Sequence, residues 1–174
     1  ASLPAPVPVE KVQLREGDLL FQDLDGSELA DAIETVTDGV CGARFSHVGM
    51  VVSVDGVVQV VEAGGRGVKI TTLKMFLARS RDSAGRPKVI VGRLDEKYQH
   101  LVPDAINYAC LQVGKPYDQP FIMGEDAFYC SELLYFAFAH ANGGEAVFPT
   151  APMTFKDPRT GEFFPAWVEY YQRL

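Results

Sequence analysis

The chain has 174 residues, of which 47% are hydrophobic and 22% charged; this suits one globular domain and excludes a disordered or collagen-like chain. Its formal net charge of -7, without any cluster of lysine and arginine, argues against nucleic-acid binding. The longest apolar runs fall short of the roughly 20 residues that a membrane-spanning helix needs, so we expect no transmembrane segment.

The chain begins with a proline-rich stretch whose composition differs from that of the remaining residues. Residues 1–13 are predicted to form an extended N-terminal leader, and residues 14–174 a single catalytic domain. Ala1 followed by Pro4, Pro6 and Pro8 resembles the processed end of an exported protein. A periplasmic or secreted location therefore stays open beside a cytoplasmic one.

The first half of the domain predicts strands interrupted by short helices. An apolar run predicts a strand over 18–22, and Asp25 with Glu28 three residues on signals the start of a helix that ends by Gly39. The strongest signal is a hairpin, with strands over 48–54 and 57–63 around an Asp55-Gly56 turn. Shorter elements complete this half: a strand over 68–71, a helix over 73–78 and a strand over 89–94.

The second half changes to helical spacing. Pro103 opens a helix that Gly114 stops, and a second helix is predicted over 130–141, ended by Gly143-Gly144. The aromatic residues of the remaining tail are expected to wrap back onto the core. Together these elements predict an α+β fold with a mostly antiparallel sheet packed against helices.

The cysteines are three in number and irregularly spaced, which fits neither a disulfide framework nor a zinc site. Cys41 lies in a glycine-flanked loop, and Cys110 reads as a small buried apolar residue of a helix. Cys130 starts the helix over 130–141, where unpaired N–H groups and the helix dipole favour a thiolate. Taken alone, this position leaves an inert, buried cysteine equally open.

A nucleophilic cysteine requires a base, and His47 is the histidine that opens a buried strand. His100 and His140 lie in a polar stretch and at a helix end, and both read as structural or solvated. The hairpin brings Glu62 near His47, where a carboxylate would orient the imidazole, although an ordinary strand-end acid stays open. Because the histidines are scattered, we expect no metal, and no cofactor.

Five segments in this order resemble the permuted papain-like amidases of the NlpC superfamily: Gly17-Asp18-Leu19-Leu20-Phe21-Gln22, Phe45-Ser46-His47-Val48-Gly49-Met50, Val61-Glu62-Ala63, Gly114-Lys115-Pro116-Tyr117-Asp118 and Tyr129-Cys130-Ser131-Glu132-Leu133. The resemblance covers nearly the whole domain and implies a circularly permuted α+β fold. It also implies that Cys130 is the nucleophile, His47 the base and Glu62 the orienting group.

Two further residues match positions in the family's motifs. Tyr117 and Gln22 are therefore candidates for lining the substrate pocket, although a locally satisfied buried side chain is as good an interpretation of Gln22. The backbone N–H of Cys130 would stabilise the oxyanion together with a second donor that the sequence does not identify.

The resulting hypothesis is a cysteine hydrolase that cleaves an amide through a thioester. Its substrate would be a cell-wall stem peptide, with peptidoglycan as the partner, or an N-acyl amino acid. One alternative is a lipid-directed acyltransferase or phospholipase with the same nucleophile. The other is a catalytically silent binding module that keeps the fold.

Overall fold

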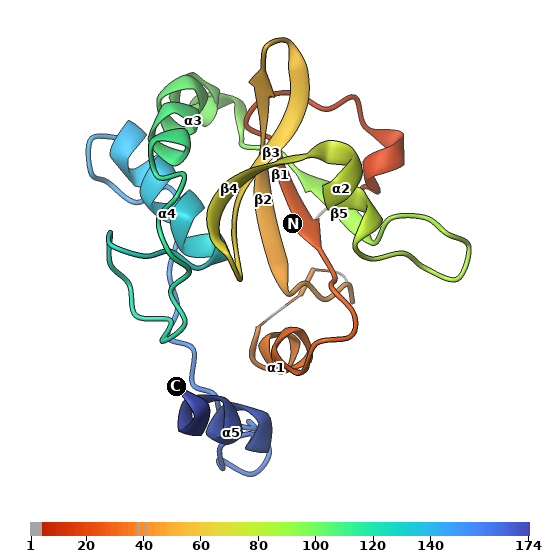
Figure 1. Cartoon of the computed structure of the whole chain (residues 1–174), viewed down its shortest axis with the longest axis vertical. Coiled ribbons are helices and arrows are strands. Elements are labelled where there is room, and N and C mark those ends of the chain that lie inside the picture. Colours follow the sequence, from red (N-terminus) through yellow and green to blue (C-terminus); the bar gives the residue numbers. More distant parts are fainter. Residues whose placement is uncertain (1–4, 38, 41) are drawn as a thin grey trace.

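A computed structural model describes residues 5–37, 39–40 and 42–174 (Figure 1). Cys41 and the first four residues lie outside the described part. The sheet has five strands in the order β4-β3-β2-β1-β5, and every neighbouring pair is antiparallel. The strands are β1 (Leu19–Gln22), β2 (His47–Val54), β3 (Val57–Gly64), β4 (Gly67–Thr72) and β5 (Val89–Gly92). The α+β fold with an antiparallel sheet is thus confirmed.

The helices follow the strands in an order that largely matches the predicted one. They are α1 (Glu28–Val36), α2 (Leu73–Ala78), α3 (Val102–Leu111), α4 (Cys130–Ala141) and α5 (Pro165–Arg173), with two 3-10 helices at Val9–Lys11 and Glu96–Leu101. None of the helices in the described ranges is long and apolar enough to cross a membrane.

The β2–β3 hairpin sets the register of the whole sheet. Asp55 and Gly56 have φ values of 52° and 76°, so both turn residues adopt the positive φ of a type I′ turn. Val54 consequently pairs with Val57, and Met50 with Val61. The predicted hairpin is confirmed with its turn in the expected place.

Each face of the sheet is covered by a different set of helices. Leu19, Met50 and Val61 point to the face that α3 and α4 cover, where they pack with Leu133 and Phe138. The alternate residues of the same strands form a second apolar cluster beneath α2: Leu20, Val51, Val60, Phe76 and Val89. Because side chains alternate along a strand, His47 and Glu62 belong to the α2 face, with Val51 and Val60.

The start of α1 differs from the prediction. The N-cap is Ser27, whose hydroxyl oxygen accepts the N–H of Ala30 at 2.9 Å. Asp25, the expected start signal, instead lies 2.6 Å from the ammonium group of Lys88. Asp25 thus takes part in an ion pair with a residue distant in the chain, and Ser27 caps the helix.

The N-terminal residues run beside the edge strand β5. Val91 donates its N–H to the carbonyl of Val7 at 3.0 Å, and Val9 is buried in the cluster beneath α2. This contact covers a sheet edge that would otherwise present unpaired backbone groups. The domain boundary at residue 13 stays a prediction.

The C-terminal tail only partly joins the main core. Phe148 packs against Phe138 of α4, with ring centroids 5.4 Å apart. Farther along, Trp167 of α5 donates its indole N–H to the carbonyl of Ala32 in α1 at 3.0 Å. Figure 1 shows α5 beside α1, at the opposite end of the molecule from the β2–β3 turn. The expectation that the tail wraps onto the core therefore holds for its first part alone.

Candidate active site

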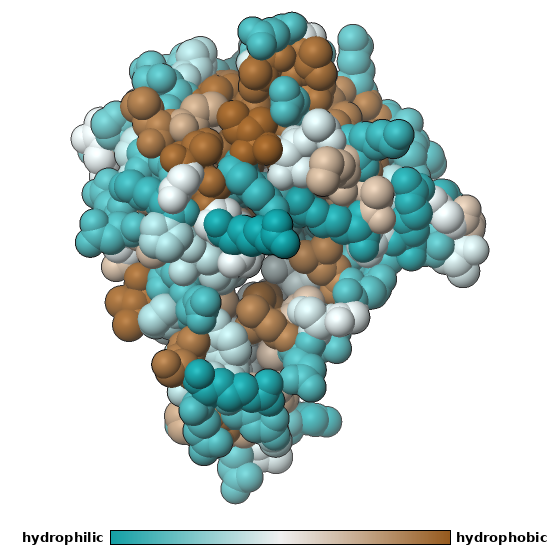
Figure 2. Space-filling model, in the orientation of Figure 1, coloured by the Kyte–Doolittle hydropathy of each residue, from teal (hydrophilic) through white to brown (hydrophobic). Residues whose placement is uncertain are grey.

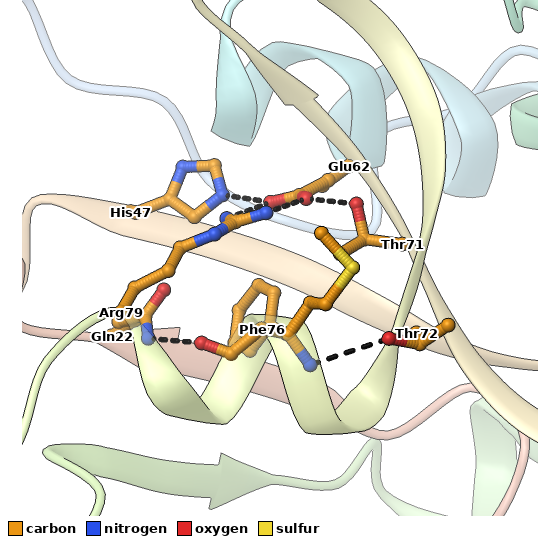
Figure 3. A network of polar contacts seen from close by, with 8 residues as sticks. Gln22, His47, Glu62, Thr71, Thr72, Phe76 and Arg79 are labelled. Carbon is orange, nitrogen blue, oxygen red and sulfur yellow. Dashed lines mark hydrogen bonds and ion pairs between the residues drawn. The ribbon is translucent and has the colours of Figure 1, made fainter.

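His47 is the first residue of β2 and lies at the end of the sheet away from the β2–β3 turn. The register places Gly64 opposite His47, so Glu62 is a diagonal neighbour on the same face of the sheet. The two side chains meet, with His47 Nε2 lying 2.6 Å from Glu62 Oε2 (Figure 3). The contact that the hairpin predicts is confirmed.

Glu62 is a fully buried carboxylate surrounded by donors. The two terminal nitrogens of Arg79 donate to its two oxygens, the first to Oε2 at 2.6 Å, and the hydroxyl of Thr71 donates to Oε1. Burial alone would raise the pKa of Glu62, but the hydrogen bonds from Arg79 and then His47 lower it far below its ordinary value. Glu62 is therefore ionised throughout the physiological range.

Cys130 occupies the first position of α4, as the sequence predicts. The first hydrogen bond of α4 runs from the N–H of Leu133 to the carbonyl of Tyr129, so the N–H groups before Leu133 have no partner within the helix. Glu132 fixes this helix start, because its carboxylate accepts the N–H groups of Tyr129 at 3.1 Å and Gly124 at 2.7 Å. The thiol thus lies at the positive end of a well-anchored helix.

The thiol of Cys130 and the imidazole of His47 lie close enough for each to shift the pKa of the other. Burial would raise the pKa of Cys130, but the hydrogen bond with His47, the imidazolium charge and the N–H groups of Val48 and Ser131 lower it. Burial would likewise lower the pKa of His47, yet hydrogen bonds with Cys130 and Glu62 raise it to about 9. Both shifts favour a thiolate beside an imidazolium.

The orientation of the imidazole follows from its second contact. Because Nε2 of His47 faces Glu62, Nδ1 is the nitrogen left for Cys130. Figure 3 shows Nδ1 pointing away from the carboxylate. The arrangement can therefore take a proton from the thiol at one ring nitrogen while the other stays bonded to a carboxylate.

Of the two predicted pocket residues, Tyr117 lines a hollow together with His47, and Gln22 pairs with His47 across strands β1 and β2. Burial and then the negative charge of Cys130 raise the pKa of Tyr117. Gln22 is fully buried, and its amide donates to the carbonyl of Phe76 at 2.8 Å. Its geometry matches a locally bonded side chain that holds α2, the interpretation that the sequence left open.

Two hollows lie beside the candidate site, one lined by His47 and the other by the chain neighbours of Cys130. One, of about 300 Å³, is lined by His47, Tyr117, Lys69 and Arg79 among others. The other, of about 340 Å³, is mainly apolar and is lined by Val48 and by both chain neighbours of Cys130. On the face shown in Figure 2, the surface is hollowed near its middle, above the part formed by α5. A larger hollow, of about 780 Å³, includes none of the predicted site residues.

Sequence reasoning missed Arg79 and Thr71 as neighbours of the carboxylate. A weak signal for Thr71 existed, because the strand predicted over 68–71 follows the hairpin and pairs with it through Lys69 opposite Glu62. Arg79 directly follows the helix predicted over 73–78, but nothing in the local pattern shows where that helix packs.

The described residues hold no group of three or more histidine, cysteine, aspartate or glutamate side chains arranged to bind a metal ion. His140 packs its ring against Tyr108, with centroids 4.9 Å apart. His100 lies in the 3-10 helix before α3. His47 differs from both, because it lies 2.6 Å from a buried carboxylate and its pKa is raised by Cys130.

Comparison with known proteins identifies a family, a relative and a solved structure of similar fold. Residues 13–172 match the model of the family described as permuted papain-like amidase enzyme, YaeF/YiiX, C92 family. A relative described as uncharacterized protein YiiX, from Escherichia coli strain K12, is 34% identical over 143 residues. That alignment covers 82% of this chain but 66% of the relative, so the chain spans just under two thirds of the relative's length.

A solved structure has a similar fold. It is described as metalloprotein yiiX from Escherichia coli O157:H7, and the superposition has a TM-score of 0.57 at 29% identity. The match covers 76% of this chain and 68% of that one. The similarity therefore extends over most of both chains.

Proposed function

This chain belongs to the permuted papain-like amidase family, and on that premise we propose that it is a cysteine hydrolase in which Cys130, His47 and Glu62 form the catalytic triad. The observation that carries the proposal is the 2.6 Å contact of His47 Nε2 with the buried carboxylate of Glu62, in a histidine whose pKa and that of Cys130 shift each other. A nucleophile, a base and a group that orients the base are the parts that such catalysis requires.

The first chemical step is attack of the Cys130 thiolate on the substrate carbonyl carbon. The carbon–sulfur bond forms, and the carbonyl electrons move onto the oxygen. As this tetrahedral species collapses, the carbon–nitrogen bond breaks and His47 gives its Nδ1 proton to the leaving amine. The products of this step are a free amine, a thioester on Cys130 and a neutral imidazole.

Hydrolysis of the thioester completes the cycle. His47 takes a proton from water, whose oxygen attacks the thioester carbon, and the carbon–sulfur bond breaks to release a carboxylic acid. The thiolate and the imidazolium are then restored. Throughout, Glu62 stays ionised and holds the ring by Nε2, so that Nδ1 faces the reacting atoms.

The backbone N–H of Cys130 supplies one donor to the developing oxyanion. This N–H is among those at the start of α4 that have no partner within the helix. Its partial positive charge lies where negative charge develops on the substrate oxygen. Tyr117 lines the hollow beside His47.

The substrate classes that fit this chemistry are a cell-wall stem peptide and an N-acyl amino acid. Both have a carbonyl carbon bonded to an amide nitrogen, and both need a proton for the leaving amine. The hollow beside His47 lies where the imidazolium can deliver that proton. We therefore place the amine half of the substrate there and the acyl half on the other side of Cys130.

A second candidate function comes from the apolar hollow beside Tyr129 and Ser131. Its walls include Leu19, Phe21 and Leu134, which suit a hydrocarbon chain. Such a pocket favours a lipid acyltransferase or phospholipase, in which the same thiol would carry an acyl group taken from an ester.

The test is to trap the acyl-enzyme. The protein is incubated with N-acyl amino acids, stem peptides or phospholipid vesicles, quenched in acid and measured by intact mass, with Cys130→Ala as the control. We expect an added acyl mass on Cys130 from at least one amide. Acylation by phospholipid with none from any amide would instead support the second candidate, and turnover that survives Cys130→Ala would exclude both.

A further inference from the structure

We propose that Arg79 is a positioning residue of this site, which sets the proton affinity of the thiol and imidazole by holding Glu62 as a carboxylate. The inference rests on the proposed function, because it assumes that His47 and Cys130 react as a pair. Arg79 does not touch the thiol; it acts through Glu62.

The geometry of the contact is that of a two-point clamp. The terminal nitrogens of Arg79 donate to different oxygens of Glu62, so the planes of the guanidinium and the carboxylate are matched. Thr71 donates to Oε1 as well, and His47 completes the set at Oε2. With both oxygens held, Glu62 presents Oε2 to the imidazole in a single orientation.

The positive charge of Arg79 sets how readily the thiol and imidazole beside Glu62 bind a proton. The reactive state contains Arg79 and His47 as cations, and Glu62 and Cys130 as anions, so its formal charge sums to zero. Without the guanidinium, the same buried cluster carries an excess negative charge and binds a further proton more readily. Removing Arg79 therefore raises the pH at which the thiolate forms.

Arg79 is the C-cap residue of α2, so the packing of this helix fixes where Arg79 lies. Phe76 anchors that helix, because it is fully buried and its carbonyl accepts the amide of Gln22. Gly49 leaves room for this packing: a Cβ there would lie 2.6 Å from Val60 and 3.2 Å from the Phe76 ring. The guanidinium carbon then lies 5.2 Å from the centre of the same ring.

A second pair in the same sheet provides a matched control. Arg93 donates to both oxygens of Asp18, at 2.6 and 2.7 Å, and Asp18 is buried like Glu62. Both arginines are partly exposed at the edge of a buried carboxylate. Arg93 pairs with Asp18 and not with Glu62, so its loss tests stability without altering the charge beside His47.

The experiment measures the rate of Cys130 alkylation by iodoacetamide against pH, by peptide mass, in the full chain. In Arg79→Gln we expect the pH at which the rate rises to move upward by about one unit, a roughly tenfold loss of rate on the acid side. Arg93→Gln should lower the melting temperature and leave that pH unchanged. An unchanged pH in Arg79→Gln, or an equal shift in Arg93→Gln, would overturn the proposal.

Arg79→Lys keeps the positive charge but replaces the two-point clamp by a single point charge. Its pH of thiolate formation should therefore fall between those of the wild type and Arg79→Gln. If Arg79→Gln does not fold, this variant decides, and a wild-type value in it overturns the proposal. If wild-type Cys130 itself shows no thiolate below its ordinary pKa, the proposed function has failed rather than the role of Arg79.

Discussion

Two half-buried cysteines on adjacent helices have thiol pKa values shifted in opposite directions. Cys110 lies near the end of α3, and burial raises the pKa of its thiol with no opposing contact. Cys130 begins α4, which packs against α3, and there the contacts with His47 and with backbone N–H groups outweigh burial and lower the pKa. Burial therefore decides the pKa shift of Cys110, whereas at Cys130 the neighbouring groups outweigh burial.

The opposite pKa shifts follow from the position of each thiol in its helix and from one neighbouring ring. Near a helix C-terminus the dipole disfavours an anion, whereas at the N-terminus it favours one. The imidazole supplies the rest, since it is the contact that most lowers the pKa of Cys130. Substitutions at either cysteine, or along the chain of contacts behind His47, separate these contributions.

The largest expected effect is that of removing the nucleophile. Cys130→Ala should reduce turnover by roughly 10⁴-fold or more, because no other group can form the thioester. The measurement is steady-state hydrolysis of whichever amide the wild type cleaves. Residual turnover near the wild-type rate would show that Cys130 is as inert as Cys110.

Glu62→Gln should have the next largest effect on turnover. It removes the charge that stabilises the imidazolium, and we expect a loss on the order of 10²- to 10³-fold, with folding checked by circular dichroism. Combined with His47→Ala, it should add little, because members of one catalytic unit are non-additive. Effects that multiply independently would mean that another residue orients the base.

The alkylation rates of the thiols compare them directly. Near neutral pH, iodoacetamide should label Cys130 on the order of 100-fold faster than Cys110, since the thiolate is the nucleophile. Cys41 should also react slowly, a prediction from the sequence for a residue outside the described part. Peptide mass spectrometry over time gives all three rates, and equal rates would contradict the assignment.

The pH dependence of turnover should be a bell with limits set by the two partners. Activity needs a deprotonated Cys130 and a protonated His47, so it rises with pH as the thiol ionises, below its ordinary pKa, and falls as His47 loses its proton near pH 9. Rates in buffers of constant ionic strength measure both limbs. A descending limb near pH 6.5 would show that His47 has no anionic partner.

The smallest effects are expected away from the thiolate. Cys110→Ala should destabilise the fold by about 1 kcal/mol, because a small partly buried group is lost, and leave turnover unchanged.

Chelation by EDTA should also leave turnover unchanged. Turnover that falls in chelator and returns with zinc would replace the thiol mechanism by a metal-dependent one.

Much of the fold could be predicted because its signals are local. The Asp55-Gly56 turn specifies the hairpin, and the change of hydrophobic period marks the start of α4 at Cys130. The hairpin register in turn brings Glu62 to His47. The N-cap of α1 is Ser27 rather than Asp25, and Asp25 instead pairs with Lys88, far along the chain.

The sequence by itself determined the strands, the main helices and the neighbours His47 and Glu62, since turn geometry and side-chain periodicity act over a few residues. Only the tertiary structure decided that Cys130 meets His47, that Gln22 bonds to the carbonyl of Phe76, and that Arg79 clamps Glu62. These contacts join segments distant in the chain. They depend on how α2 and α4 pack on opposite faces of the sheet, which shape complementarity across the whole core decides.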